Sequence, residues 1–341
     1  MKNDQIKDRS MLNEIVQPLT DWYRQNKRIL PWRDQNNAYY TWVSEIMLQQ
    51  TRVEAVKPYF QRFIGELPDV QALAECPEEK LMKLWEGLGY YNRVRNMQTA
   101  ARTVVCEYEG VLPASYEELL SLKGIGNYTA GAIASIAYQI PVPAVDGNVL
   151  RVISRITEDR QDIMKQSVRR QIEENLLGIM PEETPGDFNQ ALMELGATVC
   201  VPNGAPKCEA CPVADLCLAH QNGKEMDYPK KAQKKPRRVE KKTVLVIGDG
   251  NKTVIRKRPS KGLLAGLYEL PNLPGHLSSE EVLAWIKKEG LSPIRIRKLT
   301  DAKHIFSHIE WHMTGYVVLV EELEETFRSD MLFIEPKKTE E

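Results

Sequence analysis

Two carboxylates lie in surroundings that predict different acidities. Glu45 sits in the middle of an apolar segment from Trp42 to Leu48, so its side chain is expected to be buried. A carboxyl group removed from water has a raised pKa and holds a proton near neutral pH, as a general acid must. The alternative is a structural Glu45 that is paired with an arginine such as Arg28 or Arg33.

Asp146 directly precedes a helical pattern that starts near Val149. Its default role is to cap that helix, and a carboxylate that accepts hydrogen bonds there is expected to be ionised with a low pKa. With Glu45 it would form a pair like that of glycosidases. In those enzymes one carboxyl group protonates the leaving group and the other faces the positive charge that develops on the sugar. The sequence alone does not show that the two groups meet.

Four of the six cysteines are crowded into one segment with the spacing C-x7-C-x2-C-x5-C: Cys200, Cys208, Cys211 and Cys217. Zinc sites more often have two C-x2-C pairs separated by a longer insert, and this segment has one such pair. Four thiolates in one compact loop suit a [4Fe–4S] cluster as well or better. We therefore expect a metal or cluster here, in preference to disulfides or free thiols.

Gly124 and Gly126 separate a short helix, for which Ser115 and Glu118 predict a capping box, from a helix of small residues. Two glycines before a helix N-terminus leave backbone N–H groups open to a phosphate oxygen. The alternative is an ordinary helix–turn–helix in which glycine caps the first helix.

The elements that must position these residues change in character along the chain. Helical patterns cover residues 8–26, 42–49, 52–64, 78–85, 93–108, 149–156, 167–177 and 188–195. Strand signals begin only at 243–247 and 253, followed by a helix at 280–288 and a strand at 313–320. We expect an all-α domain at 8–222 with the cysteine loop at 200–217, a basic linker at 223–241, an α+β domain at 242–325 and a charged tail at 326–341.

The composition is that of a globular protein, with 42% apolar and 27% charged residues among 341. No stretch approaches the roughly 20 apolar residues of a membrane span, and the N-terminus lacks the apolar core of a secretion signal. We expect a cytoplasmic monomer that does not bind membranes. The net charge of −1 hides an uneven distribution, because residues 224–242 hold nine Lys/Arg against three Asp/Glu. Such a run is a solvated linker or, as the alternative, a nucleic-acid contact.

In this order and spacing, the motifs resemble the endonuclease III superfamily of DNA glycosylases, and specifically the MutY-type adenine DNA glycosylases. The resemblance covers nearly all of residues 8–320. It depends on Leu30-Pro31-Trp32-Arg33, the segment 42–51, Gly87-Leu88-Gly89-Tyr90-Tyr91, the helix–hairpin–helix at 122–130, Val145-Asp146-Gly147-Asn148 and the cysteine loop.

The resemblance implies hydrolytic removal of adenine mispaired with 8-oxoguanine or guanine in duplex DNA, after the base has been flipped out of the stack. Glu45 would protonate adenine N7 and then activate water, and Asp146 would stabilise the charge on the sugar. Asn148 and Tyr128 would position these two groups. The implied adenine pocket comprises Arg28, Leu30, Trp32 and Arg33. The implied DNA and lesion contacts are Gln50, Thr51, Leu88, Tyr90, Lys123, Gly124 and Gly126. Trp32 and Tyr90 could instead be core aromatics.

Tyr128 discriminates within the superfamily, because bifunctional members carry a lysine at this position. The lysine amine forms a Schiff base with the sugar and leads to strand cleavage, which a phenol cannot do. The resemblance therefore implies a monofunctional enzyme. Through the cysteine loop it also implies a [4Fe–4S] cluster as the cofactor. The alternatives are a bifunctional glycosylase/lyase, a non-enzymatic helix–hairpin–helix DNA-binding protein and, more distantly, a nucleotide hydrolase.

The second domain resembles the Nudix-like recognition domain of the same family, through segments 262–271 and 304–308. It lacks the Arg-Glu-x-x-Glu-Glu cluster with which Nudix hydrolases hold metal, so we expect no phosphohydrolysis. Phe306, Ser307 and His308 would probe 8-oxoguanine, or would form only a polar turn. The first domain departs from the family pattern in two ways. The first cysteine spacing is x7 where x6 is usual, which makes Cys200 the least secure ligand, and Lys123 replaces the usual proline.

Overall fold

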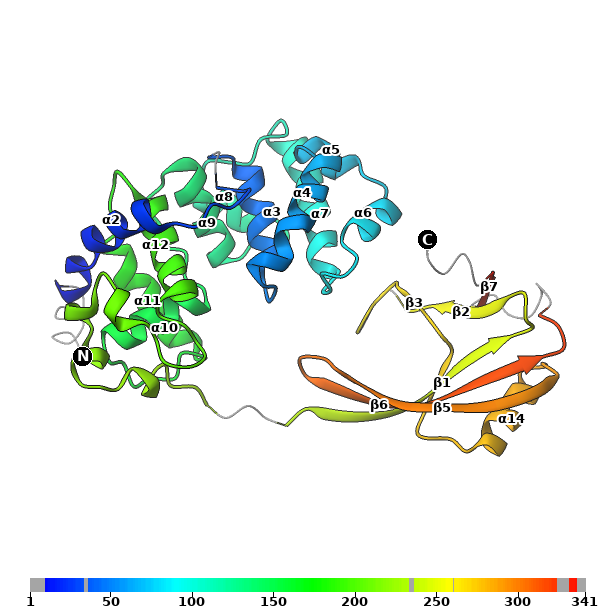
Figure 1. The fold of residues 1–341 in the computed structure, drawn as a ribbon. Coiled ribbons are helices and arrows are strands. Elements are labelled where there is room, and N and C mark those ends of the chain that lie inside the picture. Colours follow the sequence, from blue (N-terminus) through cyan, green and yellow to red (C-terminus); the bar gives the residue numbers. More distant parts are fainter. Residues whose placement is uncertain (1–9, 34–35, 233–235, 260, 324–330, 336–341) are drawn as a thin grey trace. The chain divides into compact units, whose positions relative to one another are not determined.

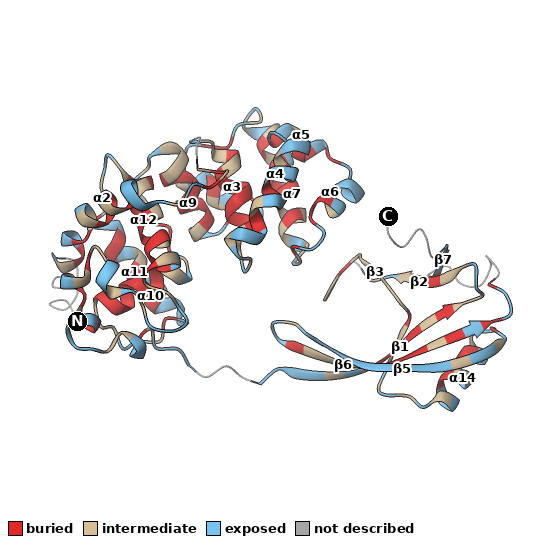
Figure 2. Ribbon diagram, viewed as in Figure 1, coloured by how far each residue is buried: buried red, intermediate tan, exposed pale blue. Residues whose placement is uncertain are grey.

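The computed structural model describes residues 10–33, 36–232, 236–259, 261–323 and 331–335. The chain forms two compact units, residues 1–232 and 233–341 (Figure 1). The first unit is helical and the second is built on a sheet. The buried residues form two cores in the first unit and one core in the second (Figure 2).

The helices of the first unit enclose two cores. Its elements are α2 (Val16–Asn26), α3 (Ala38–Leu48), α4 (Val53–Glu66), α5 (Val70–Glu75), α6 (Glu78–Leu84), α7 (Asn92–Glu107), α8 (Tyr116–Ser121), α9 (Asn127–Tyr138), α10 (Gly147–Ile156), α11 (Gln166–Leu177), α12 (Pro185–Thr198) and α13 (Leu218–Gln221). One core is built mainly from residues between Leu30 and Ala134, and the other from α2 and the segment after Val145. Helices α3, α9, α12 and α10 pack in succession, so they join the two cores.

Local sequence explains the helices that carry the candidate site. Helix α3 starts at Asn37, whose side chain accepts a hydrogen bond from the backbone N–H of Tyr40 at 3.1 Å. Every residue from Thr41 to Met47 is buried, because the helix is apolar on almost all sides. Helix α10 starts at Asp146, and its Val149 and Leu150 are fully buried.

Some local expectations differ from the structure. The expected helix at 8–26 is interrupted by a turn at Ile15, and the short helix α5, which the side chain of Asp69 caps, was not expected. The Ser115 hydroxyl accepts a hydrogen bond from the Glu118 N–H at 3.3 Å, which is one half of the expected capping box. A capping box with both halves caps α14 (Ser279–Lys288) instead.

The second unit contains a mixed sheet of seven strands in the order β3-β2-β1-β6-β5, with β4 paired to β1 and β7 to β2. The strands are β1 (Arg238–Gly248), β2 (Thr253–Lys257), β3 (Tyr268–Glu269), β4 (Asn272–Pro274), β5 (Pro293–Ile305), β6 (Ile309–Val320) and β7 (Met331–Ile334). Strands β1 and β6 are parallel, with Val246 opposite Val317, and the other pairs are antiparallel. Val282 and Ile286 of α14 pack with buried strand residues to form the core of the second unit.

Two expected boundaries need correction. Residues 331–334, assigned to a charged tail, form β7 and pair with β2. The expected linker at 223–241 is largely structured, because Tyr228 is buried in the first unit and β1 begins at Arg238. Within the described residues, no helix is long and apolar enough to cross a membrane.

Candidate active site

Glu45 is buried on α3, with 7% of its surface exposed, and accepts a hydrogen bond from the hydroxyl of Tyr128. The pKa of Glu45 is raised to about 7. Burial is the largest cause, the bond from Tyr128 offsets part of the rise, and the nearby charge of Asp146 adds to it. The carboxyl group can therefore exchange a proton near neutral pH. Pairing of Glu45 with Arg28 or Arg33, the structural alternative, is wrong, because both arginines bind Glu194.

Tyr128 lies in the first turn of α9 and holds the Glu45 carboxyl group from one side. Burial raises the pKa of Tyr128 well above its usual value, and the neighbouring Glu45 charge raises it further. The phenol therefore stays protonated and acts as a hydrogen-bond donor. The sulfur of Met193 lies 3.8 Å from the same hydroxyl oxygen.

Asp146 caps α10 by accepting bonds from the backbone N–H groups of Asn148 and Val149, each at 2.8 Å. The side-chain amide of Asn148 donates a third bond at 2.7 Å. The expected low pKa is nevertheless wrong, because burial raises the pKa of Asp146 more than these bonds lower it. The charge of Asp146 raises the pKa of Glu45, so the two carboxyl groups interact electrostatically.

Asn148 extends the site toward the cysteine loop. Its side-chain oxygen accepts a bond from Arg151 at 2.9 Å, and Arg151 also donates to the carbonyl oxygens of Gly196 at 2.7 Å and Cys200 at 2.9 Å. A Cβ at Gly196 would lie 2.6 Å from the Asn148 Cβ, so glycine lets α12 approach α10 closely. Arg151 thereby connects the Asp146 cap to the first cysteine.

Two residues of the expected adenine pocket, Arg28 and Arg33, bind a buried glutamate that the sequence interpretation missed. Glu194 accepts bonds from Arg28 at 2.6 Å and from Arg33 at 2.7 Å. Burial raises the pKa of Glu194, but these two bonds outweigh it and leave the pKa lowered. Leu30 and Trp32 are buried in the first core. The apolar neighbours of Glu194 on α12 give the same signal that drew attention to Glu45, and it was overlooked.

The expected DNA contacts fall into exposed and buried residues. Gln50 and Tyr90 are exposed and have left-handed backbones, with φ of 63° and 48°. Thr51 is half-buried at the end of α3, and its N–H donates to the Leu48 carbonyl at 3.2 Å. Leu88 is only 6% exposed and lies in the first core, so the structure does not present it at the surface.

The glycine hairpin joins α8 to α9 through a left-handed turn. Gly124 has a φ of +82°, and a Cβ there would lie 2.7 Å from the Asn96 Cβ, so the position requires glycine. Helix α9 begins after Gly126 without a side-chain cap. Lys123 is exposed beside this helix end.

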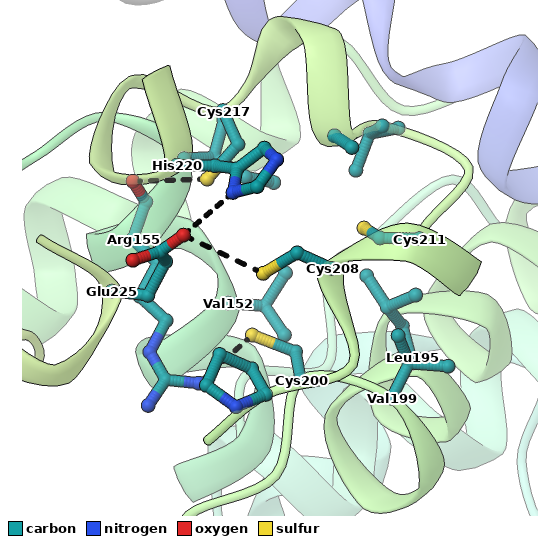
Figure 3. A pocket seen from close by; sticks show the side chains of 14 residues that line it. Val152, Arg155, Leu195, Val199, Cys200, Cys208, Cys211, Cys217, His220 and Glu225 are labelled. Atoms are coloured by element: carbon teal, nitrogen blue, oxygen red, sulfur yellow. Dashed lines mark hydrogen bonds and ion pairs between the residues drawn. The ribbon is translucent and has the colours of Figure 1, made fainter. Parts of the chain in front are cut away.

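The four clustered cysteines line one pocket with apolar neighbours, as Figure 3 shows. Burial raises the pKa of Cys208 to about 11 and that of Cys211 to about 12, and the charges of neighbouring thiolates add to both shifts. Several thiolates can share this pocket only with a cation that balances their charge, so the donor set fits a metal centre. Cys200 lines the pocket with the others, although the x7 spacing made it the least secure ligand.

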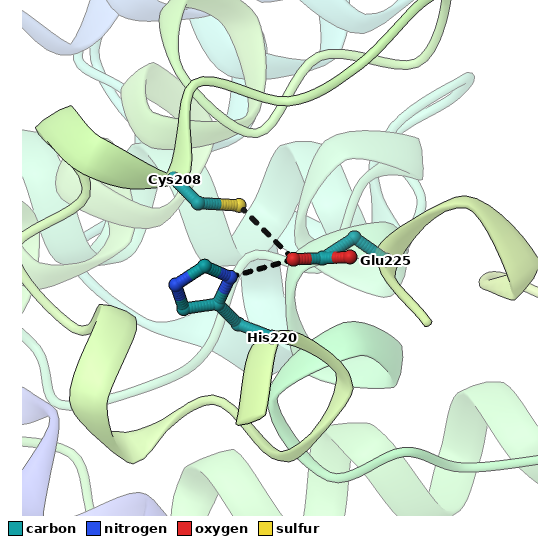
Figure 4. Close-up of side chains that lie close together, drawn as sticks. All are labelled: Cys208, His220 and Glu225. Atoms are coloured by element: carbon teal, nitrogen blue, oxygen red, sulfur yellow. Dashed lines mark hydrogen bonds and ion pairs between the residues drawn. The ribbon is translucent and has the colours of Figure 1, made fainter. Parts of the chain in front are cut away.

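His220 and Glu225 also line this pocket, and sequence reasoning did not single them out. The His220 Nδ1 lies 2.6 Å from Glu225 Oε1, and the Cys208 thiol lies 3.8 Å from the same oxygen (Figure 4). Ligand atoms of these three residues all lie within 4.8 Å of one another, so they form a group that could hold a metal ion.

Comparison with known families supports the two-part architecture. Residues 43–177 match the model of the HhH-GPD superfamily of base excision DNA repair proteins, and residues 243–341 match a NUDIX domain. The structure of a thermostable thymine-DNA glycosylase superposes with a TM-score of 0.55 at 27% identity, over 63% of this chain and 98% of that one. The helical fold of the first unit and the Nudix-like fold of the second are thus confirmed.

Similarity to curated proteins extends over both units. The mouse adenine DNA glycosylase is 37% identical over 86% of this chain and 68% of its own length. An adenine DNA glycosylase of Buchnera aphidicola subsp. Baizongia pistaciae is 32% identical over 91% of this chain and 87% of its own length. The chain belongs to the adenine DNA glycosylase family. Membership in the adenine DNA glycosylases assigns it hydrolysis of N-glycosyl bonds in base excision repair.

The Nudix-like unit of this adenine DNA glycosylase family member presents the remaining candidates at a hairpin turn. Phe306 donates its N–H to the Ile309 carbonyl at 2.8 Å, which closes the turn between β5 and β6. Ser307 and His308 are exposed at its tip, and the Phe306 ring packs edge-on against Trp311 with centroids 4.8 Å apart. The turn is therefore anchored by Phe306 and leaves the next two side chains accessible.

Proposed function

We propose that this enzyme removes adenine paired with 8-oxoguanine or guanine in duplex DNA, without cutting the strand. The observation that carries the proposal is Glu45, a buried carboxyl group with a pKa of about 7 that is hydrogen-bonded to Tyr128 and electrostatically coupled to Asp146. This is the arrangement that acid-assisted departure of a purine needs, because one group must donate a proton while another tolerates positive charge.

The proposed reaction uses each group at a stated atom. Protonated Glu45 gives its proton to adenine N7, and the bond between the sugar C1′ and adenine N9 breaks with its electron pair leaving on the base. Asp146 faces the cationic sugar. Glu45, now a carboxylate, takes a proton from the water that attacks C1′, which yields free adenine and an abasic site and returns Glu45 to its acid form.

The residues around these carboxylates have positioning roles. Tyr128 donates to one oxygen of Glu45 and leaves the other free to carry the transferred proton. Asn148 holds the Asp146 carboxylate through its side-chain amide. Because Tyr128 is a phenol, the site has no amine at this position to form a Schiff base with the sugar, so the proposed enzyme is monofunctional.

The expected adenine pocket would lie beside Glu45. The buried Glu194 fixes the guanidinium groups of Arg28 and Arg33, and Arg33 exerts its charge on Glu45. Leu30 and Trp32 would supply an apolar wall for the flipped base. These contacts favour an aromatic base in the pocket, as base-flipping enzymes require.

The helical unit would hold the DNA backbone with Lys123, Gly124 and Gly126, whose helix end is open to a phosphate. Gln50, Thr51, Leu88 and Tyr90 would contact the duplex around the flipped adenine. Leu88 would have to leave the core to do so. Phe306, Ser307 and His308 would contact 8-oxoguanine, with the Ser307 hydroxyl able to donate and accept hydrogen bonds.

We further propose that the four cysteines hold a [4Fe–4S] cluster. Such a cluster would act as a structural centre that orders the loop from Cys200 to Cys217, and no chemical step passes through it. Support comes from the shared pocket and from the Nη1 of Arg155, which lies 3.2 Å from the Cys200 sulfur and can donate to a thiolate. Iron with a brown colour in the purified protein is expected, whereas a colourless protein that contains zinc would contradict the cluster.

Substitution Glu45→Gln tests the catalytic assignment. Glutamine keeps an acceptor for the Tyr128 hydroxyl but cannot donate a proton as the acid does. The variant should bind a duplex with adenine opposite 8-oxoguanine and leave the adenine in place. Full excision by Glu45→Gln would overturn the role of Glu45 as the acid.

A further inference from the structure

Gln50 and Tyr90 share an unusual backbone conformation. Both are non-glycine residues with positive φ, at 63° and 48°, and both side chains are exposed. A left-handed backbone is strained for an ordinary residue and persists only where the surrounding structure imposes it. Gln50 follows the C-terminal end of α3, and Tyr90 lies in the turn before α7.

A single side chain binds the backbone next to both residues. One terminal nitrogen of Arg93, Nη1, donates to the carbonyl oxygens of Ile46 at 2.6 Å and Gln49 at 2.8 Å. The other, Nη2, donates to those of Leu88 at 3.1 Å and Gly89 at 3.2 Å. Gln49 and Gly89 immediately precede the two left-handed residues, so Arg93 fixes the peptide that enters each strained position.

The bonding of Arg93 differs from that of an ordinary ion pair. Within the part of the chain that the structure describes, no carboxylate pairs with Arg93, and its buried Nε has no hydrogen-bond partner. Its guanidinium carbon lies 5.5 Å from the ring centroids of both Trp85 and Tyr90. Carbonyl oxygens and aromatic rings bind the guanidinium group of Arg93, so no carboxylate of the described residues neutralises its positive charge between the two turns.

We propose that Arg93 is a positioning residue that locks the turn at Gln49–Thr51 and the turn at Leu88–Tyr90 into one rigid unit for entry into the duplex. The inference rests on the proposed function, which places Gln50 and Tyr90 against DNA. Because both left-handed conformations are already formed in the free enzyme, DNA binding does not have to order the two turns. This pre-organisation increases the affinity of the enzyme for DNA.

Binding measurements on Arg93→Gln and Arg93→Lys test the proposal in a Glu45→Gln background, where the substrate stays intact. The probe is a duplex with adenine opposite 8-oxoguanine. Arg93→Gln should raise the Kd about tenfold or more, because both turns must then be ordered on binding. Arg93→Lys, with one charged nitrogen for four carbonyls, should fall between Arg93→Gln and the parent. The control is Arg102→Gln on the same helix, where Arg102 donates to the Ala74 carbonyl at 3.1 Å; its Kd should not change.

Hydrogen exchange distinguishes positioning from a general loss of stability. Arg93→Gln should speed amide exchange in both peptides, 46–52 and 86–92, while the cysteine loop stays protected. Faster exchange in only one of the two peptides, or an unchanged Kd, would overturn the proposal. Faster exchange in the cysteine loop as well would show a general loss of stability and would also contradict the positioning role.

The catalytic step gives a second readout in the otherwise unmodified enzyme. Arg93→Gln should raise KM by a larger factor than it lowers the single-turnover rate at saturating enzyme. A larger effect on the single-turnover rate than on KM would contradict the role of Arg93 in positioning the two turns for DNA binding. Failure of the proposed function would differ from all these outcomes, because the unmodified enzyme would then neither bind nor process the adenine duplex selectively.

Discussion

The raised pKa of Glu45 predicts a pH-dependent cost to folding that can be measured without any DNA. The pKa of Glu45 rises from 4.5 to about 7. This is a shift of about 2.5 units at roughly 1.4 kcal/mol each, so ionised Glu45 would cost the folded state on the order of 3 kcal/mol. The stability that protonated Glu45 contributes is fully present below its pKa of 4.5 in the unfolded chain. This contribution is lost as the pH rises through about 7.

Substitution Glu45→Gln removes this titration and keeps an oxygen that can accept the Tyr128 bond. Urea unfolding should therefore show the variant gaining stability over the unmodified protein by about 2–3 kcal/mol between roughly pH 5 and pH 8.5. Glu107→Gln, at an exposed glutamate on α7, is the matched control and should show no such trend. A difference between Glu45→Gln and the parent that stays constant over this pH range would show that Glu45 does not have a raised pKa in the folded protein.

Three further predictions concern neighbouring residues. Tyr128→Phe removes a hydrogen bond that lowers the pKa of Glu45. The alkaline limb of the single-turnover pH profile should therefore move to higher pH by about one unit while the maximum rate falls. An unmoved limb would show that this bond does not affect the pKa of Glu45. Glu194→Gln leaves the partly buried Arg28 and Arg33 without a carboxylate and should cost about 3 kcal/mol in urea unfolding, an estimate that a loss under 1 kcal/mol would contradict. Ser307→Ala should lower the preference for 8-oxoguanine over guanine in competition assays and leave excision from the guanine pair unchanged; equal discrimination would make Ser307 a bystander.

Features that depend on near neighbours in the chain could be predicted from the sequence. The burial of Glu45 follows from the apolar residues on both sides of it, and the capping role of Asp146 follows from the helix directly after it. The hairpin between β1 and β2 is likewise local, with Gly248 opposite Thr253. Such patterns need no knowledge of distant packing.

Features that depend on distant segments were missed. The partner of Arg28 is Glu194, which lies 166 residues further along the chain. The pKa of Asp146 was predicted too low, because its hydrogen bonds are local whereas much of its burial comes from elements packed around it. Strand β5 was missed because charged residues occupy half of its exposed positions, and β7 was missed because only pairing with β2 defines it.

An excision assay on end-labelled duplexes tests whether this enzyme is a monofunctional adenine glycosylase. The enzyme is incubated with duplexes that carry adenine opposite 8-oxoguanine, thymine glycol or only normal pairs, and each sample is analysed with and without hot alkali. Cleavage of the adenine strand alone is expected, and only after alkali has opened the abasic site. Cleavage without alkali would contradict the monofunctional mechanism, and the absence of any product would contradict the proposed glycosylase activity itself.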